Sequence, residues 1–366
     1  MMEVIRDAGP KLKSFFYHVS KPSDDSLVKG CVVVLHGAEG YGGRYEPLGE
    51  ELLKYGYAMF AIDHIGHGKT TMEDKDLIGK WEDKDFYFSA YNAYYLVDKV
   101  KKMYPGRPVY VIGDDYGGTM AQYMMGKFDN IFDGVIISSC GMPSFRDYVM
   151  FLKCWIKKVL LYDGTKSNGT FKSRTRFLNM HFKPNRTKYD WMNSVNEEVD
   201  RFIDDPLSGY VCTIGYYYYQ YKYIVATPRI NRLKKANKDL PMLFLGGGDD
   251  YITHRGKLIE SLKAYYEKKG FSNVESIIYD RSRHDVLLEW NKEQVALDIV
   301  NFINKNFYKS ETYVERKEHI EENEVVEVKE ITLGDFSPYR AKETIDATFV
   351  EEEPEDDLKL STEIKK

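Results

Sequence analysis

The sequence has few cysteines and no long apolar run, and each absence excludes a class of protein. Its four cysteines, in 366 residues, show neither a CxxC spacing nor a pattern of metal ligands, so they predict no metal site. This cysteine usage favours a reducing compartment. No segment approaches the roughly 20 consecutive apolar residues that span a bilayer. The first residues lack the apolar core of a signal peptide, so we expect a cytoplasmic protein.

The chain also lacks an overall positive charge. Its net charge is −5, which does not suggest nucleic acid as a partner. The charge is uneven, because residues 311–366 contain 18 acidic and 8 basic residues. This acidic tail is poor in core periodicity, and we expect it to be disordered.

Strand and helix patterns alternate over much of the remaining chain. The β-branched run Cys31–Leu35 is typical of a strand that is buried on both faces of a parallel sheet. Asp85–Tyr104 predicts a long amphipathic helix that a Pro-Gly pair ends. The order predicts an α/β fold, a mostly parallel sheet with helices on both faces. Further strands are expected at 11–18, 57–62, 109–112, 132–139, 241–245 and 274–279, and further helices at 45–54, from 119 on, at 256–269 and at 292–306.

The alternation stops between residues 141 and 239. We interpret this segment as a helical cap, inserted between two parts of one core at 1–140 and 240–310. Aromatic and basic residues dominate its first half. A solvated face is the favoured explanation of the basic residues, and transient contact with an anionic membrane surface is the alternative. These basic residues are Lys153, Lys157, Lys158, Lys166, Lys172, Arg174, Arg176, Lys183, Arg186 and Lys188.

A strand, a sharp turn and a helix follow one another around Asp115. The apolar strand Val109–Ile112 runs into Gly113-Asp114-Asp115-Tyr116-Gly117-Gly118, and a helical pattern follows. This is the context of a nucleophile elbow, in which small residues let a sharp turn lift the central side chain above the sheet. The usual centre is serine, whereas here it is an aspartate.

Three polar residues end three predicted strands in the order Asp115, Asp249, His284. This is the chain order nucleophile, acid, base. We prefer Asp249 as the acid because it directly follows the glycine turn, with Asp250 as the alternative. Either aspartate could instead be a simple helix cap, and His284 could be a loop histidine. The three together, in order and at strand ends, favour a catalytic role.

Two backbone N–H groups are expected to form an oxyanion hole. One belongs to Tyr116, directly after the elbow aspartate, and the other to Ala38 in the loop after the strand Cys31–Leu35. We interpret the nearby histidines as residues that hold loops rather than catalyse. They are His36, His64 and His67.

The segment His36–Thr70 resembles the monoacylglycerol lipase and lysophospholipase branch of the α/β-hydrolase superfamily. The motif Arg44–Leu48, the turn Asp63–Gly68 and Asp205–Leu207 late in the cap are similar to that branch as well. The resemblance implies the α/β-hydrolase fold with a lid. It also implies a serine nucleophile, and Asp115 departs from that pattern.

The elbow Gly113–Gly118 resembles that of the epoxide hydrolases instead. A carboxylate with an ordinary pKa of about 3.9 is already ionised at pH 7 and attacks without a base. Against an ester it would form an unfavourable anhydride, so Asp115 favours opening of an epoxide or a carbon–halogen bond. His284, oriented by Asp249, would then activate water to hydrolyse the ester formed on Asp115.

The resemblance to epoxide hydrolases implies tyrosines in the cap that donate to the leaving oxygen. We expect Tyr162 and Tyr219 in this role, although packing is the alternative explanation of the run Tyr216–Tyr223. Tyr116, where a dehalogenase would have tryptophan, makes dehalogenation less favoured. The sequence thus predicts a cofactor-free and metal-free hydrolase of a lipophilic, fatty-acid-type epoxide. The alternatives are an ester hydrolase of the lysophospholipase or monoacylglycerol lipase type, and an inactive lipid-binding relative.

Overall fold

A computed structural model describes residues 2–8, 14–71, 75–128, 131–229, 233 and 236–307. The predicted acidic tail at 311–366 lies outside these residues, as do the first three positions of the strand expected at 11–18. Among the described residues, no helix is both long enough and apolar enough to cross a membrane.

An eight-stranded, mostly parallel sheet forms the centre of the fold, in the order β1-β2-β4-β3-β5-β6-β7-β8. β1 and β2 form an antiparallel edge, and the six strands from β4 to β8 run parallel. The inner strands are buried on both faces, which explains their continuous apolar sequences. The strands are β1 (Glu3–Asp7), β2 (Phe15–Ser20), β3 (Gly30–Leu35), β4 (Tyr57–Asp63), β5 (Val109–Asp114), β6 (Gly134–Ser138), β7 (Met242–Gly247) and β8 (Val274–Tyr279).

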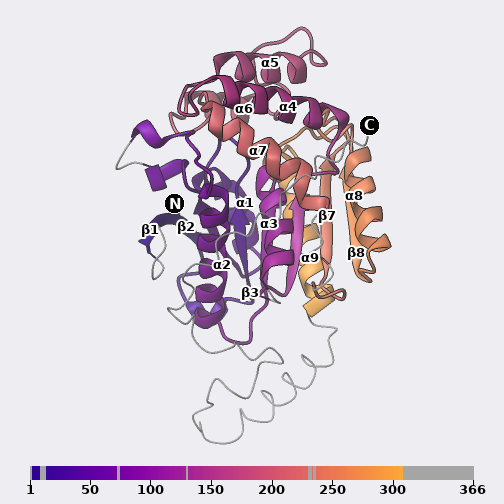
Figure 1. Ribbon diagram of the computed structural model, residues 1–366. Coiled ribbons are helices and arrows are strands. Elements are labelled where there is room, and N and C mark those ends of the chain that lie inside the picture. Colours follow the sequence, from indigo (N-terminus) through magenta and orange to yellow (C-terminus); the bar gives the residue numbers. More distant parts are fainter. Residues whose placement is uncertain are drawn as a thin grey trace, which may run out of the picture. The chain divides into compact units, whose positions relative to one another are not determined.

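Helices cover both faces of this sheet (Figure 1). On one face α1 and α9 pack together and close a hydrophobic core with residues of β3, β4 and β5. On the other face α2 packs on α3, and α8 joins α3 through the hydrogen bond from Tyr266 Oη to Gln122, 3.1 Å long. These helices are α1 (Glu46–Leu53), α2 (Asp85–Met103), α3 (Tyr116–Lys127), α8 (Lys257–Lys268) and α9 (Lys292–Phe307).

Four helices lie between β6 and β7 in the chain, and Figure 1 shows them together above one end of the sheet. We call this segment, residues 141–239, the cap. Its first helix begins at Ser144, where the carboxylate of Asp147 accepts the backbone N–H of Ser144 in a capping box. The predicted α/β sheet with a helical insertion is therefore confirmed. The cap helices are α4 (Phe145–Leu160), α5 (Asn168–Asn179), α6 (Asn196–Asp204) and α7 (Ile214–Ala226).

The turn between β5 and α3 has the sterically demanding geometry that its glycines predict. Asp115 has φ 47° and ψ −111°, a conformation that is costly for a residue other than glycine. A Cβ atom on Gly117 would lie 1.9 Å from the carbonyl oxygen of Leu35, and one on Gly113 would lie 2.5 Å from that of Gly117. The neighbouring backbone segments can approach this closely only because both positions are glycine.

We predict that Gly117→Ala destabilises the protein by about 3 kcal/mol, because the added methyl group must displace the backbone of β3. Denaturant unfolding measures the change. Gly169→Ala is the matched control, since its nearest neighbour would be a lysine amine 3.8 Å away. If both substitutions had the same small effect, the close contact with Leu35 would not constrain the elbow.

Candidate active site

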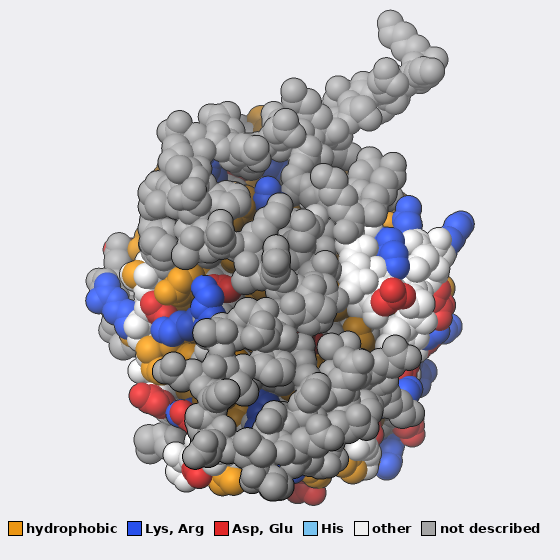
Figure 2. Space-filling view, turned by 90° about the horizontal axis from the view of Figure 1, so that it is seen from below, with side chains coloured by type: hydrophobic (Ala, Val, Ile, Leu, Met, Phe, Trp, Pro, Cys, Tyr) orange, Lys and Arg blue, Asp and Glu red, His pale blue; other side chains and the backbone are white. Residues whose placement is uncertain are grey.

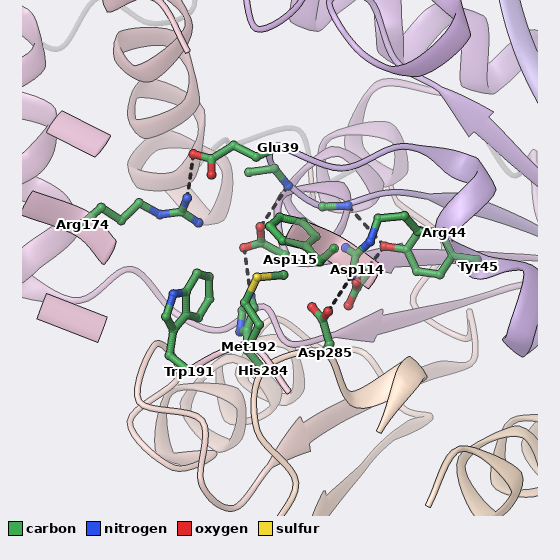
Figure 3. Close-up of a pocket in the computed structure, with 13 residues that line it drawn as sticks. Glu39, Arg44, Tyr45, Asp114, Asp115, Arg174, Trp191, Met192, His284 and Asp285 are labelled. Carbon is green, nitrogen blue, oxygen red and sulfur yellow. Dashed lines mark hydrogen bonds and ion pairs between the residues drawn. The ribbon is translucent and has the colours of Figure 1, made fainter. Parts of the chain in front are cut away.

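The carboxylate of Asp115 lies at the carboxyl end of the parallel strands, where ligand sites of open α/β sheets occur. Its Oδ2 atom accepts a hydrogen bond of 3.0 Å from the N–H of Ala38, in the loop after β3. Its Oδ1 atom lies 3.6 Å from Nε2 of His284. Tyr116 is the first residue of α3, so its N–H is one that the helix itself leaves unbonded. The structure brings the predicted nucleophile Asp115 and the predicted base His284 together (Figure 3), and Ala38 donates to Asp115.

The acid partner of His284 is Asp250, and our preference for Asp249 is wrong. Nδ1 of His284 lies 3.0 Å from Oδ2 of Asp250, and since a carboxylate can only accept, Nδ1–H donates. Asp250 is 1% exposed and also accepts from the hydroxyl of Thr253. Asp249 instead faces Arg255 at the surface, at 3.3 Å. The turn after β7 directs these adjacent side chains differently, and the glycine spacing alone did not reveal which one points inward.

His284 carries a positive charge in this arrangement. Burial alone would lower the pKa of its imidazole, but the carboxylates of Asp250 and Asp115 outweigh burial and raise the pKa well above its usual value. For Asp115, burial would raise the pKa, yet His284, Arg174 and the Ala38 N–H hold the pKa below its ordinary value. Nε2 of His284 is buried and has no hydrogen-bond partner among the described residues. The resting site thus pairs an imidazolium with an ionised carboxylate.

The two tyrosines expected to act from the cap do not reach the site. The side chain of Tyr162 is 75% exposed. Tyr219 lies under the amines of Lys158 and Lys222, 5.1 and 5.7 Å from its ring centroid. Neither residue lines the cavity beside Asp115. The helical phase of α7 instead directs Tyr217 toward the loop after β3. Both assignments are therefore wrong.

A buried ion pair between Glu39 and Arg174 was missed by the sequence analysis. Nη1 of Arg174, in α5, donates to Oε1 of Glu39 at 2.8 Å, and both side chains are less than 10% exposed. The sequence placed Arg174 among residues of a solvated face. A signal was present, because Phe171, Arg174 and Leu178 follow a helical period and share the buried side of α5. Glu39 directly follows the predicted oxyanion loop.

A second group of charged residues lies on the other side of Asp115. Asp114 accepts from the hydroxyl of Tyr45 at 2.7 Å, and Arg44 pairs with Asp285 at 2.8 Å. Burial and the nearby charge of Asp285 raise the pKa of Asp114 to about 7. Asp114 is therefore partly protonated at neutral pH, which limits the negative charge beneath Asp115.

A small cavity lies between the core and the cap at this point (Figure 3). Its volume of about 20 Å³ leaves room for about one water molecule. Asp115, His284 and Arg174 contribute polar atoms to its lining, and Trp191 and Met192 contribute apolar surface. In the described part of the chain, no group of three histidine, cysteine, aspartate or glutamate side chains is arranged to hold a metal ion.

The surroundings of His36 and His67 agree with the role of holding loops that the sequence predicted for them. His36 accepts from the backbone N–H of His64 at 3.1 Å, and His67 lies 3.0 Å from the hydroxyl of Tyr216. All three rings are buried, and burial lowers the pKa of each one. The neutral rings of His36 and His67 hydrogen-bond within the loops after β3 and β4, whereas neither ring nitrogen of His64 has a hydrogen-bond partner among the described residues.

The sheet, the elbow and the acid–histidine pair at the strand ends define an α/β-hydrolase. Within this class, the chain belongs to the family described as serine aminopeptidase, S33, whose model matches residues 26–291. The elbow of this member carries Asp115 at the nucleophile position.

Individual relatives and solved structures are similar to this chain as well. Human monoglyceride lipase is 32% identical over 216 residues, which are 59% of this chain and 61% of the human protein. A monoglyceride lipase homolog of Monkeypox virus is 32% identical over 111 residues, 30% of this chain and 38% of the viral protein. The match therefore spans less than two thirds of either relative.

Two solved structures share the fold. A thermostable carboxyl esterase from Bacillus coagulans aligns with a TM-score of 0.74 and 18% identity, over 84% of this chain and 99% of its own. A soluble variant of monoglyceride lipase from Saccharomyces cerevisiae aligns with a TM-score of 0.66 and 17% identity, over 83% of this chain and 96% of its own. These structures support the α/β-hydrolase fold.

The neighbouring pair Asp249 and Asp250 allows a matched test of the acid. We predict that Asp250→Asn lowers the pKa of His284, because it removes a charge that stabilises the imidazolium, and that Asp249→Asn leaves it unchanged. Histidine NMR titrations, with His284→Gln for assignment, measure the change. An equal or larger effect of Asp249→Asn would contradict this pairing.

Proposed function

We propose that this hydrolase opens lipophilic epoxides, of the fatty-acid type, to diols through an ester on Asp115. The observation that carries the proposal is the state of the Asp115 carboxylate. One oxygen is held by the Ala38 N–H, and the other borders the cavity. The group is ionised and raised on a strained turn, so it is ready to attack without a base.

In the first step, Oδ1 of Asp115 forms a bond to an epoxide carbon while the strained ring C–O bond breaks. The leaving oxygen then takes a proton, and the imidazolium of His284 supplies it through a water molecule. Esterification removes the negative charge of Asp115, which is one of the charges that raise the pKa of His284. The first step therefore converts His284 to the neutral base that the second step needs.

In the second step, neutral His284 takes a proton from water, and the resulting hydroxide attacks the ester carbonyl of Asp115. Asp250 keeps the imidazole oriented through Nδ1. The N–H groups of Ala38 and Tyr116 stabilise the oxyanion. Collapse releases the diol, which takes the remaining proton, so Asp115 is again a carboxylate and His284 an imidazolium. A positioned base of this kind contributes about 10²–10⁴ in rate.

The second candidate function is hydrolysis of a glycerol ester, which the likeness to human monoglyceride lipase favours. The charge state of the site opposes it. Asp115 would form an anhydride with an ester, and a protonated His284 cannot act as a base. This candidate therefore requires that a glycerol ester be cleaved without the elbow residue as nucleophile.

Intact mass spectrometry tests the two candidates together. We predict that His284→Gln, incubated with an epoxy fatty acid, slowly accumulates a covalent adduct on Asp115, because water then supplies the proton of the leaving oxygen, and that the native protein forms the diol. Asp115→Asn combined with His284→Gln is the control and should form no adduct. Release of fatty acid from a monoacylglycerol or a short-chain ester by the native protein, without an adduct from the epoxide, would favour the second candidate.

The cap supports a second proposal, that α4 brings the protein to a lipid surface. The outer face of α4 exposes large apolar side chains, with Phe145 84%, Leu160 72% and Val159 65% exposed. Where described residues are visible at the end of the molecule opposite the cap, Figure 2 shows hydrophobic, positive and negative side chains interspersed. Two basic residues of the cap are not available to a lipid surface, because Lys157 donates to Thr170 and Arg174 is buried.

We predict that Val159→Asp combined with Leu160→Asp weakens binding to phosphatidylcholine vesicles at least tenfold. Each lost apolar contact is worth about 2 kcal/mol, and 1.4 kcal/mol is a factor of about ten. Vesicle sedimentation measures binding, and Leu27→Asp, at a residue 59% exposed outside the cap, is the matched control. Binding only to vesicles that contain phosphatidylserine, lost with salt, would instead indicate an electrostatic contact.

A further inference from the structure

The guanidinium of Arg174 is the cation that the cap contributes to the cavity beside Asp115. It is 6% exposed and reaches the cavity from α5, on the side opposite to the sheet. Figure 3 shows it extended between Glu39 and Asp115. Its charge is one cause of the low pKa of Asp115, so it acts on the proposed nucleophile directly.

Arg174 contacts Glu39 and Trp191, and Glu39 is itself held by two further segments of the chain. Glu39 accepts from Nη1 at 2.8 Å, and the hydroxyl of Tyr217 in α7 donates to the same carboxylate at 3.3 Å. The backbone carbonyl of Glu39 also accepts from the N–H of Gly209 at 3.0 Å. The guanidinium lies 5.5 Å from the ring centroid of Trp191. The side chain is therefore fixed in this arrangement of cap and core.

The ion pair with Glu39 leaves most of the hydrogen-bonding capacity of Arg174 available. A guanidinium has five N–H donors, and Glu39 accepts from one of them. When Asp115 attacks, its negative charge passes to an oxygen on the far side of the reacting carbon. For a substrate lying between core and cap, that oxygen faces the cap. Tyr217 already donates to Glu39, and Tyr219 does not line the cavity, so neither of these tyrosines supplies the donor.

We propose that Arg174 holds the leaving oxygen of the epoxide in the first step by a charge-assisted hydrogen bond, a role that rests on the proposed function above. The bond from Asp115 Oδ1 to carbon forms, the ring C–O bond breaks, and its electron pair stays on the oxygen beside the guanidinium. Arg174 keeps its own protons, because a guanidinium does not deprotonate in proteins. The alkoxide takes its proton from His284 through water. Glu39 is then a positioning residue.

The test follows ester formation and ester hydrolysis separately. On the His284→Gln background, Arg174→Met should slow formation of the Asp115 ester with an epoxy fatty acid by about 10²–10³, the usual loss for one donor to a developing oxyanion. Arg176→Met removes the same charge from the exposed side of the same helix and should leave the rate unchanged. With His284 present, Arg174→Met should slow ester formation but leave hydrolysis of the formed ester unchanged, whereas a general structural defect would slow both.

One further variant and two distinct outcomes separate a failure of the Arg174 role from a failure of the proposed function. Arg174→Met leaves Glu39 buried without its partner, so Arg174→Met combined with Glu39→Gln keeps the test informative if the single variant does not fold. If His284→Gln forms the ester and the Arg174 variants form it equally fast, the role of Arg174 is overturned and the proposed function stands. If His284→Gln forms no ester and the native protein forms no diol, both proposals fall.

Discussion

A buried imidazolium between two carboxylates is the interaction on which the rest of the site depends. His284 lies 3.0 Å from Asp250 and 3.6 Å from Asp115. With an uncharged elbow residue, one carboxylate would remain beside the histidine, and the imidazole would be less readily protonated. The aspartate elbow adds a second negative charge, and the same geometry then favours the charged ring. One residue thus changes both the chemical group at the nucleophile position and the charge that the neighbouring histidine favours.

The half-buried elbow carboxylate lies between two arginines, and each arginine is itself paired with a carboxylate. Arg174 lies on the cap side, paired with Glu39, and Arg44 lies on the core side, paired with Asp285. Removing one partner of such a buried pair costs about 3–5 kcal/mol, whereas an exposed pair such as Arg255 with Asp249 contributes about 0–1 kcal/mol. These two arginines are therefore integral to a site that is built around a permanent anion.

The sequence predicted those site residues whose positions follow from a local motif or from a fixed spacing after a strand. The periodicity of apolar residues predicted the strands and helices of the fold. The elbow motif placed Asp115, Ala38 and Tyr116, because each follows a strand at a fixed spacing. The choice between Asp249 and Asp250 failed because adjacent turn residues point in different directions. Tyr162 and Tyr219 failed for a related reason. Among the described residues of the cap no strand sets its orientation, so the packing of its helices decides which side chains face the core.

The position of the cap therefore controls both the space and the charge in the cavity. Arg174 and Trp191 come from the cap, whereas Asp115 and His284 come from the core. A cavity of about 20 Å³ holds about one water molecule, so a lipid can enter only if the described cap residues move. The Glu39–Arg174 pair joins the cap to the loop after β3 and resists that movement. The pair also fixes the cation of Arg174 over Asp115. Closing of the cap therefore also brings the last charged side chain to the cavity.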